Sequence, residues 1–176
     1  MSGLERLRAL LRDGGGIMAT LLAPESDTPA EAGHSPAALA ADGPRTAPRR
    51  EEYELLIEAI YEGYLLHYGS PRVVSVPEAD MGLLAGDRLY AMGLARLVTL
   101  GDTEAVSELA DTITLSALAQ GAGELELAEA VWAAGAYAVG WGSSDVHRQA
   151  KNLVYAGDSR ALEAMRTSVA AVSATP

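Results

Sequence analysis

Residues 50–68, REEYELLIEAIYEGYLLHY, repeat their acidic and apolar side chains with the period of an α-helix. At about 100° per residue, four acidic residues fall within one narrow stripe: Glu51, Glu54, Glu58 and Glu62. The opposite face carries Tyr53, Leu56, Ile60, Tyr64 and His67. The stretch therefore predicts a helix whose apolar face packs into a core.

The segments that follow have the same helical period, and none of them alternates as a strand would. We expect helices over residues 78–99, 103–120, 124–142, 144–155 and 159–173. Pro71 and Pro77 bracket the run RVVSV, whose β-branched residues favour an extended connector over a helix. The sequence thus predicts an all-α helical bundle over residues 50–176.

Two segments precede this domain. Leu4, Leu7 and Leu11 recur at helical spacing, which predicts a short amphipathic helix within residues 1–22. Residues 23–49 are rich in Pro, Ala, Gly and small polar residues, which bury too little area to offset the entropy of ordering. We expect a flexible linker there. Glycines and acidic residues interrupt the stretch that would otherwise suit an export signal.

The charge balance excludes several classes of partner. The chain carries 13 basic and 24 acidic residues and a net charge of −11, which disfavours binding to nucleic acid or anionic lipid. It has no cysteine, which excludes disulfides, thiolate catalysis and cysteine metal sites. No apolar run reaches the roughly 18 residues that a membrane span needs. We expect a cytoplasmic protein that binds no nucleic acid and meets a membrane only indirectly.

The acidic stripe of residues 50–68 has two interpretations. Carboxylates such as those of Glu58 and Glu62 could supply the oxygen ligands that Mg²⁺ prefers. An acidic stripe opposite an apolar face is also what a helix presents to water, and we favour this second interpretation.

Asp87 is expected on an apolar face. On a helix over residues 78–99 it shares one face with Leu83, Tyr90, Leu94 and Val98, so burial is expected. A buried carboxylate needs a partner, for which Arg72, a tyrosine or the cation of a ligand is available. We favour a structural aspartate over one that binds a ligand. Gly86 beside it permits the close approach of another backbone.

Small residues dominate residues 128–142, AEAVWAAGAYAVGWG. Either neighbouring helices come close to such a helix, or a cavity opens beside it. Trp132, Tyr137 and Trp141 are the large side chains around Gly135. We favour close helix packing, inside the chain or across a dimer, over an apolar ligand tunnel. His147, on the next helix, is expected to be exposed.

The segment HYGSPRVVSVPEADMGLLAGDRLYAMGLARL, residues 67–97, resembles part of the trans-type polyprenyl diphosphate synthases, which are isoprenoid synthases. In that family an Asp-rich D-D-x-x-D helix precedes R-R-G-K-P-T and then L-A-G-D. Matching the family's Gly-x-Pro to residues 69–71 places L-A-G-D on residues 84–87 without a gap. It also places the Asp-rich motif on residues 58–62. The resemblance, over residues 54–142, implies a helical fold like part of an isoprenoid synthase.

The departures from the family bear on activity. The family's aspartates bind diphosphate through Mg²⁺, and here Ala59 replaces the central one. His67 and Tyr68 replace the arginine pair, and Ser70 replaces the motif lysine. Lys151 is the one lysine of the chain, and no second Asp-rich motif is present. The resemblance therefore implies a site that lacks the positive charge needed to stabilise a departing diphosphate.

From these departures we expect a shortened, degenerate and non-catalytic relative that assembles with itself or with a larger protein, such as a full-length prenyl synthase. Docking would use the Ala/Gly-rich helices and residues 2–22. In a first alternative, Glu58, Glu62 and Asp87 still bind Mg²⁺ and a prenyl diphosphate. In a second, the bundle holds an apolar isoprenoid or a quinone beside Trp132 and Tyr137. No cofactor is expected outside the Mg²⁺ alternative.

Overall fold

The computed structural model describes residues 1–24 and 35–170. Within them the regular structure is helical, apart from one isolated bridge between Leu22 and Val74. The elements are α1 (Gly3–Gly14), α2 (Gly16–Thr20), α3 (Pro36–Ala41), the 3-10 turn η1 (Ala47–Arg49), α4 (Arg50–Tyr68), α5 (Ala79–Leu100), α6 (Thr103–Gly121), α7 (Leu125–Trp141), α8 (Asp145–Tyr155) and α9 (Ala161–Ala170). The prediction of an all-α bundle is confirmed, and α4 to α9 closely follow the predicted ranges.

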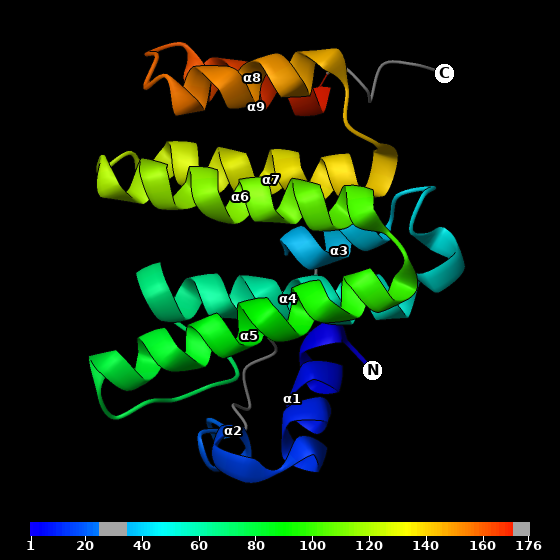
Figure 1. Cartoon of the computed structure of the whole chain (residues 1–176), viewed down its shortest axis with the longest axis vertical. Helices are drawn as coiled ribbons and strands as arrows, with labels where there is room; N and C mark the ends of the chain where they lie inside the picture. The colour runs from blue at the N-terminus through cyan, green and yellow to red at the C-terminus, as the bar shows by residue number, and fades with distance from the viewer. Residues whose placement is uncertain (25–34, 171–176) are drawn as a thin grey trace.

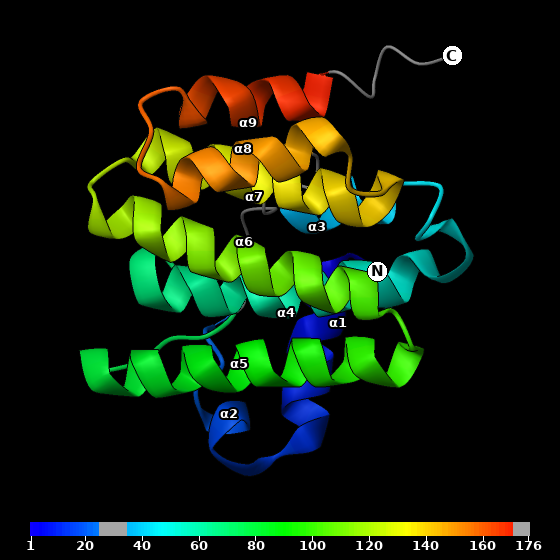
Figure 2. The ribbon, with the colours of Figure 1, turned by 45° about the horizontal axis from the view of Figure 1, so that its top comes forward.

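Three helical hairpins are stacked as layers (Figure 1): α4 with α5, α6 with α7, and α8 with α9. The layers follow chain order because short loops return each helix antiparallel to the one before it. Helices α1 and α2 lie on the far side of the α4–α5 layer from α6 and α7 (Figure 2). This leaves α4 in the middle of the molecule, with other elements packed around it.

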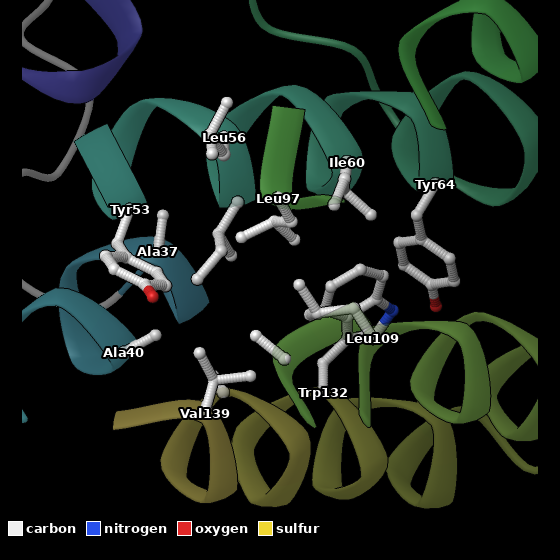
Figure 3. Packing of buried hydrophobic residues seen from close by; sticks show 13 residues of the cluster. Ala37, Ala40, Tyr53, Leu56, Ile60, Tyr64, Leu97, Leu109, Trp132 and Val139 are labelled. Atoms are coloured by element: carbon white, nitrogen blue, oxygen red, sulfur yellow. The ribbon is translucent and has the colours of Figure 1, made fainter. Parts of the chain in front are cut away.

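The space between α4 and α7 is filled in two different ways (Figure 3). At one end Trp132 of α7 meets Tyr61 and Tyr64 of α4, with ring centroids 4.9 and 5.2 Å from its own. At the other end α3 is inserted between the two helices, and its Ala37 and Ala40 are fully buried. Large aromatic side chains therefore fill the space between α4 and α7 at one end of the core, and the small-residue helix α3 fills it at the other end.

The prediction of a flexible linker over residues 23–49 is wrong for residues 35–49, which the structure describes. Residues 25–34 lie outside the described residues, but α3 follows them as a helix with Ala37, Ala40 and Ala41 buried. We expected small residues to bury too little area to be ordered. Here they are ordered because only small side chains fit between α4 and α7.

The turn after α3 is fixed to the C-terminal end of α7. Gly43 lies so close to Gly140 that a Cβ on Gly43 would sit 2.2 Å from the Gly140 carbonyl oxygen. Arg45 donates its backbone N–H to that same oxygen at 3.0 Å and its Nη1 to the carbonyl of Val139 at 2.7 Å. Arg45 thus satisfies carbonyls that the end of α7 leaves free.

The predicted N-terminal amphipathic helix is confirmed as α1. Ser2 and Glu5 form a reciprocal capping box at its start, and Leu7 and Leu11 are buried. The connector between α4 and α5 is extended, as predicted. It pairs with the chain after α2, where Ser75 donates its N–H to the carbonyl of Leu21 at 2.8 Å.

Candidate functional site

The acidic stripe of α4 is buried where it was expected to be solvated. Glu62 is 0% exposed and Glu58 is 3% exposed. Both lie beneath the connector that joins α4 to α5, where Arg72 reaches back over them. The prediction that water covers these two carboxylates is therefore wrong. Glu51, at the start of the stripe, does remain exposed.

Glu62 is the anchor of the connector. Its Oε1 accepts the backbone N–H groups of Arg72, Val73 and Val74 at 2.7, 2.6 and 3.1 Å. Its Oε2 accepts Nε of Arg72 at 3.2 Å, and Glu58 Oε2 accepts Arg72 Nη2 at 2.6 Å. The two carboxylates thus share one guanidinium and three main-chain donors, which is the compensation that buried charge requires.

These contacts occupy three of the four carboxylate oxygens that the Mg²⁺ interpretation needs. Arg72 also lies over the ring of Tyr61, 5.0 Å from its centroid, so it is held from two sides. Across residues 1–24 and 35–170, no three His, Asp or Glu side chains gather in a way that could hold a metal ion. Glu58 and Glu62 are arranged to bind the guanidinium of Arg72 rather than a metal ion.

The next carboxylate of the stripe, Glu54, fixes α1. Arg6 donates Nη1 to Glu54 at 2.9 Å and pairs through Nη2 with Glu51 at the same distance. Gly3 of α1 has Cγ of Glu54 and Cγ of Glu58 within 2.9 Å of where its Cβ would lie. The N-terminal segment, which we expected to dock on a partner, packs on α4 of its own chain.

Asp87 is not buried, so the prediction that its face of α5 packs into the core is wrong. Its side chain is 68% exposed, and α5 turns Gly82, Ala85, Gly86, Leu89, Gly93 and Leu97 inward. The partner of Asp87 is His67, whose Nε2 lies 3.3 Å from Oδ1 and 3.2 Å from the carbonyl of Leu83. Both neighbours of Nε2 are acceptors, so we assign a proton to that nitrogen.

Gly86 is needed where His67 meets α5. A Cβ on Gly86 would lie 2.3 Å from Cδ2 of His67 and 2.9 Å from the carbonyl oxygen of Gly63. The expectation that Gly86 permits a close approach is confirmed. His67 thus joins α4 to α5.

The Ala/Gly-rich helix is packed inside the chain. Trp132 and Tyr137 are buried, and Tyr137 stacks on Trp141 with ring centroids 4.4 Å apart. Gly135 faces Thr112 of α6, whose Oγ1 would lie 2.0 Å from an added Cβ. We favoured close helix packing, inside the chain or across a dimer, and the packing inside the chain accounts for these small residues.

A second polar cluster joins α6 to α8. His147, which we expected to be exposed, is 4% exposed, and its Nε2 lies 2.5 Å from Glu108 Oε1. Lys151 donates Nζ to Glu108 Oε2 at 2.9 Å and to Asp111 Oδ2 at 2.7 Å. Nδ1 of His147 lies 3.4 Å from the hydroxyl of Ser168. The one lysine of the chain, four residues from His147, was the signal for this cluster.

The cluster is structural in character. Burial by itself would raise the pKa of Glu108, but the bonds from His147 and Lys151 outweigh burial and hold that pKa below its ordinary value. Ser168, whose hydroxyl lies beside Nδ1 of His147, is buried and donates to the carbonyl of Met165 at 2.7 Å. No substrate could reach that hydroxyl, so we assign no nucleophile here.

Hollows on the described surface include two that are small for a ligand site. One, of about 270 Å³, is lined by Arg45, Pro48, Arg49, Tyr53, Leu100, Gly101 and Asp102. The other, of about 300 Å³, is lined by Arg45, Glu104, Ser107, Glu108, Ala138, Val139, Ser143, Arg148 and Lys151. Neither is lined by the carboxylates of α4, or by Trp132 and Tyr137, beside which our second alternative places an apolar ligand.

The first hollow contains a tyrosine with a perturbed pKa. Burial, together with the hydrogen bond to Asp102, raises the pKa of Tyr53 to about 12. Tyr53 donates to Asp102 Oδ2 at 2.6 Å. A phenol with so high a pKa is a fixed donor at neutral pH, not a base, so the contact joins α4 to the start of α6.

Comparisons with protein-family models, with curated proteins and with solved structures give no match for this chain. In the part of the chain that the structure describes, every helix is too short or too polar to cross a membrane.

Proposed function

We propose that the protein is a non-catalytic interaction subunit with a shortened, prenyl-synthase-like bundle, and that it assembles with itself or with a larger protein. The observation that carries this proposal is the use made of Glu58 and Glu62. Their side chains hold Arg72 and the connector instead of presenting oxygens to a ligand.

Two cations that could serve diphosphate chemistry, Arg72 and Lys151, are also held by carboxylates. Arg72 is the cation nearest to the two carboxylates, and both of them neutralise it. Lys151 is held by Glu108 and Asp111 in the α6–α8 layer. Catalysis of prenyl transfer needs free positive charge at the diphosphate as the leaving group departs. The pairing of Arg72 and Lys151 with carboxylates supports a protein that packs its helices like a prenyl synthase but does not catalyse prenyl transfer.

An association function is supported by the surface of α5. Leu83, Leu84 and Val98 are large apolar side chains on that helix, and all three are exposed. Scattered apolar residues are ordinary on a protein surface, but several on one helix are typical of an interaction site. Because α1 and α7 are packed mainly inside the chain, the three exposed apolar side chains of α5 make this helix our candidate for docking.

The full-length chain is expected to be recovered from its host in an assembly heavier than its own 18.3 kDa. Affinity purification under mild salt, followed by light scattering and native mass spectrometry, measures that mass and counts the subunits. A second copy or a different subunit in the complex would support the proposal. Recovery of only a free monomer, at protein concentrations well above micromolar, would contradict it.

A further inference from the structure

Helix α5 has a second apolar face, opposite the one it buries. At about 100° per residue, Leu84, Ala91, Ala95 and Val98 lie along one line on its outside, which we call the outer stripe. Leu84 is 67% exposed and Val98 is 59% exposed, and both alanines are exposed. The stripe runs about 21 Å along the helix, from Leu84 to Val98.

The composition of α5 does not suit a helix with one face in water. Among its 22 residues only Asp80, Asp87, Arg88 and Arg96 are charged. A helix that is apolar around its whole circumference is normally buried on all sides. Here α4 packs on the inner side of α5, and the residues of the outer stripe are exposed. The outer stripe is a face without a described neighbour.

Two opposite charges border the outer stripe. Asp87 and Arg88 are adjacent in sequence and so point about 100° apart, one on each side of the line through Leu84 and Ala91. Both are exposed, and Arg88 has no ion pair with any described residue. Asp87 has His67 beside it but keeps most of its carboxylate in water. The stripe therefore has an acidic edge and a basic edge at the same height on the helix.

We propose that the outer stripe of α5 binds the outer stripe of a second copy of this chain, with the two helices parallel and related by a two-fold axis. In that arrangement the acidic edge of each helix meets the basic edge of the other, so Asp87 pairs with Arg88 of the second copy twice. The inference rests on the proposed association function and specifies its surface and its partner.

In the parallel arrangement, both Asp87 and Arg88 of each chain meet an opposite charge on the other chain. Its two-fold axis runs along the helices, so every stripe residue faces its own counterpart, and Ala91 and Ala95 allow the helices to approach closely. An antiparallel pair would bring each acidic edge against an acidic edge, with Asp87 opposite an alanine. Two chains of net charge −11 also repel one another, so pairing requires salt to screen that repulsion.

Single cysteines test the geometry cleanly, because the natural chain has none. Under mild oxidation, Leu84→Cys alone and Val98→Cys alone are each expected to give a covalent dimer, since a disulfide needs Cα atoms within about 7 Å. In an antiparallel pair like positions would lie about 21 Å apart. Only a mixture of the two variants would then cross-link. Glu163→Cys, on the exposed side of α9 and away from the outer stripe, is the matched control and is expected to give no covalent dimer.

Charge reversal tests the pairing of the edges. Asp87→Arg and Arg88→Asp are each expected to weaken self-association about tenfold, because like charges then face each other. A mixture of the two variants is expected to restore binding as a heterodimer, as is the double variant. Sedimentation equilibrium measures each affinity, and circular dichroism checks that the fold is intact. A role of Asp87 in folding alone would not be rescued by a second chain.

The outcomes separate this inference from the proposed function. Cross-linking of single variants with rescue by mixing supports the parallel pair. Cross-linking only between Leu84→Cys and Val98→Cys overturns the arrangement. A chain that is monomeric alone but recovered with a different protein overturns the second copy as occupant and leaves the association function standing. A chain that is monomeric in both settings overturns both.

Discussion

Replacing Glu62 with alanine is expected to lower the free energy of unfolding by about 3 to 5 kcal/mol, the usual cost of removing one partner from a buried charge pair. The change leaves Arg72 with one carboxylate and leaves the N–H groups of Val73 and Val74 without their acceptor. Those two residues are buried, so water does not replace the lost oxygen. Urea unfolding followed by circular dichroism measures the loss.

Two variants make this result specific. Glu62→Gln keeps an oxygen of the same shape for the main-chain donors and is expected to lose less than the alanine variant. Glu51→Ala removes a carboxylate of the same helix whose side chain is 77% exposed, and its effect is expected to stay within about 0.5 kcal/mol. Equal stabilities for the Glu62→Ala and Glu51→Ala variants would show that the buried stripe does not hold the connector.

The second large effect is expected at Glu108. Glu108→Ala leaves His147 without its acceptor and leaves Lys151 with Asp111 alone, and we expect a loss of about 3 to 5 kcal/mol at neutral pH. Glu104→Ala, at an exposed position one turn earlier on α6, is the control. Chemical denaturation of both variants gives the comparison. A loss below about 1 kcal/mol for Glu108→Ala would contradict the structural role of the cluster.

Glu108 also gives the protein a defined sensitivity to acid. The folded state holds its pKa below the ordinary value of 4.5, so the unfolded state binds more protons once the pH falls below that value. The stability that Glu108 contributes is therefore present above about pH 4.5 and is lost as the pH falls through the folded pKa. The natural chain is expected to lose more stability between pH 7 and pH 3 than the Glu108→Gln variant.

The helices themselves could be predicted from the sequence because their signals are local. The apolar period of residues 50–68 and the turn at Gly101 and Asp102 depend on neighbouring residues alone, and α4, α5 and α6 begin and end close to the predicted positions. Asp102 caps α6 by accepting the N–H of Ala105 at 3.0 Å. Such signals need no knowledge of the tertiary fold.

The environment of the acidic stripe could not be predicted in the same way. Whether Glu62 meets water depends on where the connector lies after α4 has ended, and helical period says nothing about that. The donors that bury Glu62 are ten to twelve residues further along the chain. When these donors are not known, the acidic stripe predicts a face in contact with water.

The errors at Asp87 and in the linker have different causes. Helix α5 is apolar on two faces, so its period did not decide which face is inside, and the face that contains Asp87 proved to be the outer one. In residues 35–49, alanine and glycine resemble a linker by composition. They are buried because α4 and α7 leave a gap that fits only small side chains.

The central claim is that the positions resembling a diphosphate site serve folding and association instead of chemistry. Isothermal titration of the purified full-length chain with geranyl diphosphate, in the presence and absence of Mg²⁺, tests it most directly, with isopentenyl diphosphate added afterwards to detect condensation. We predict no heat of binding in either condition and no condensation product. Magnesium-dependent binding of the diphosphate, or any prenyl transfer by the chain alone, would contradict the claim.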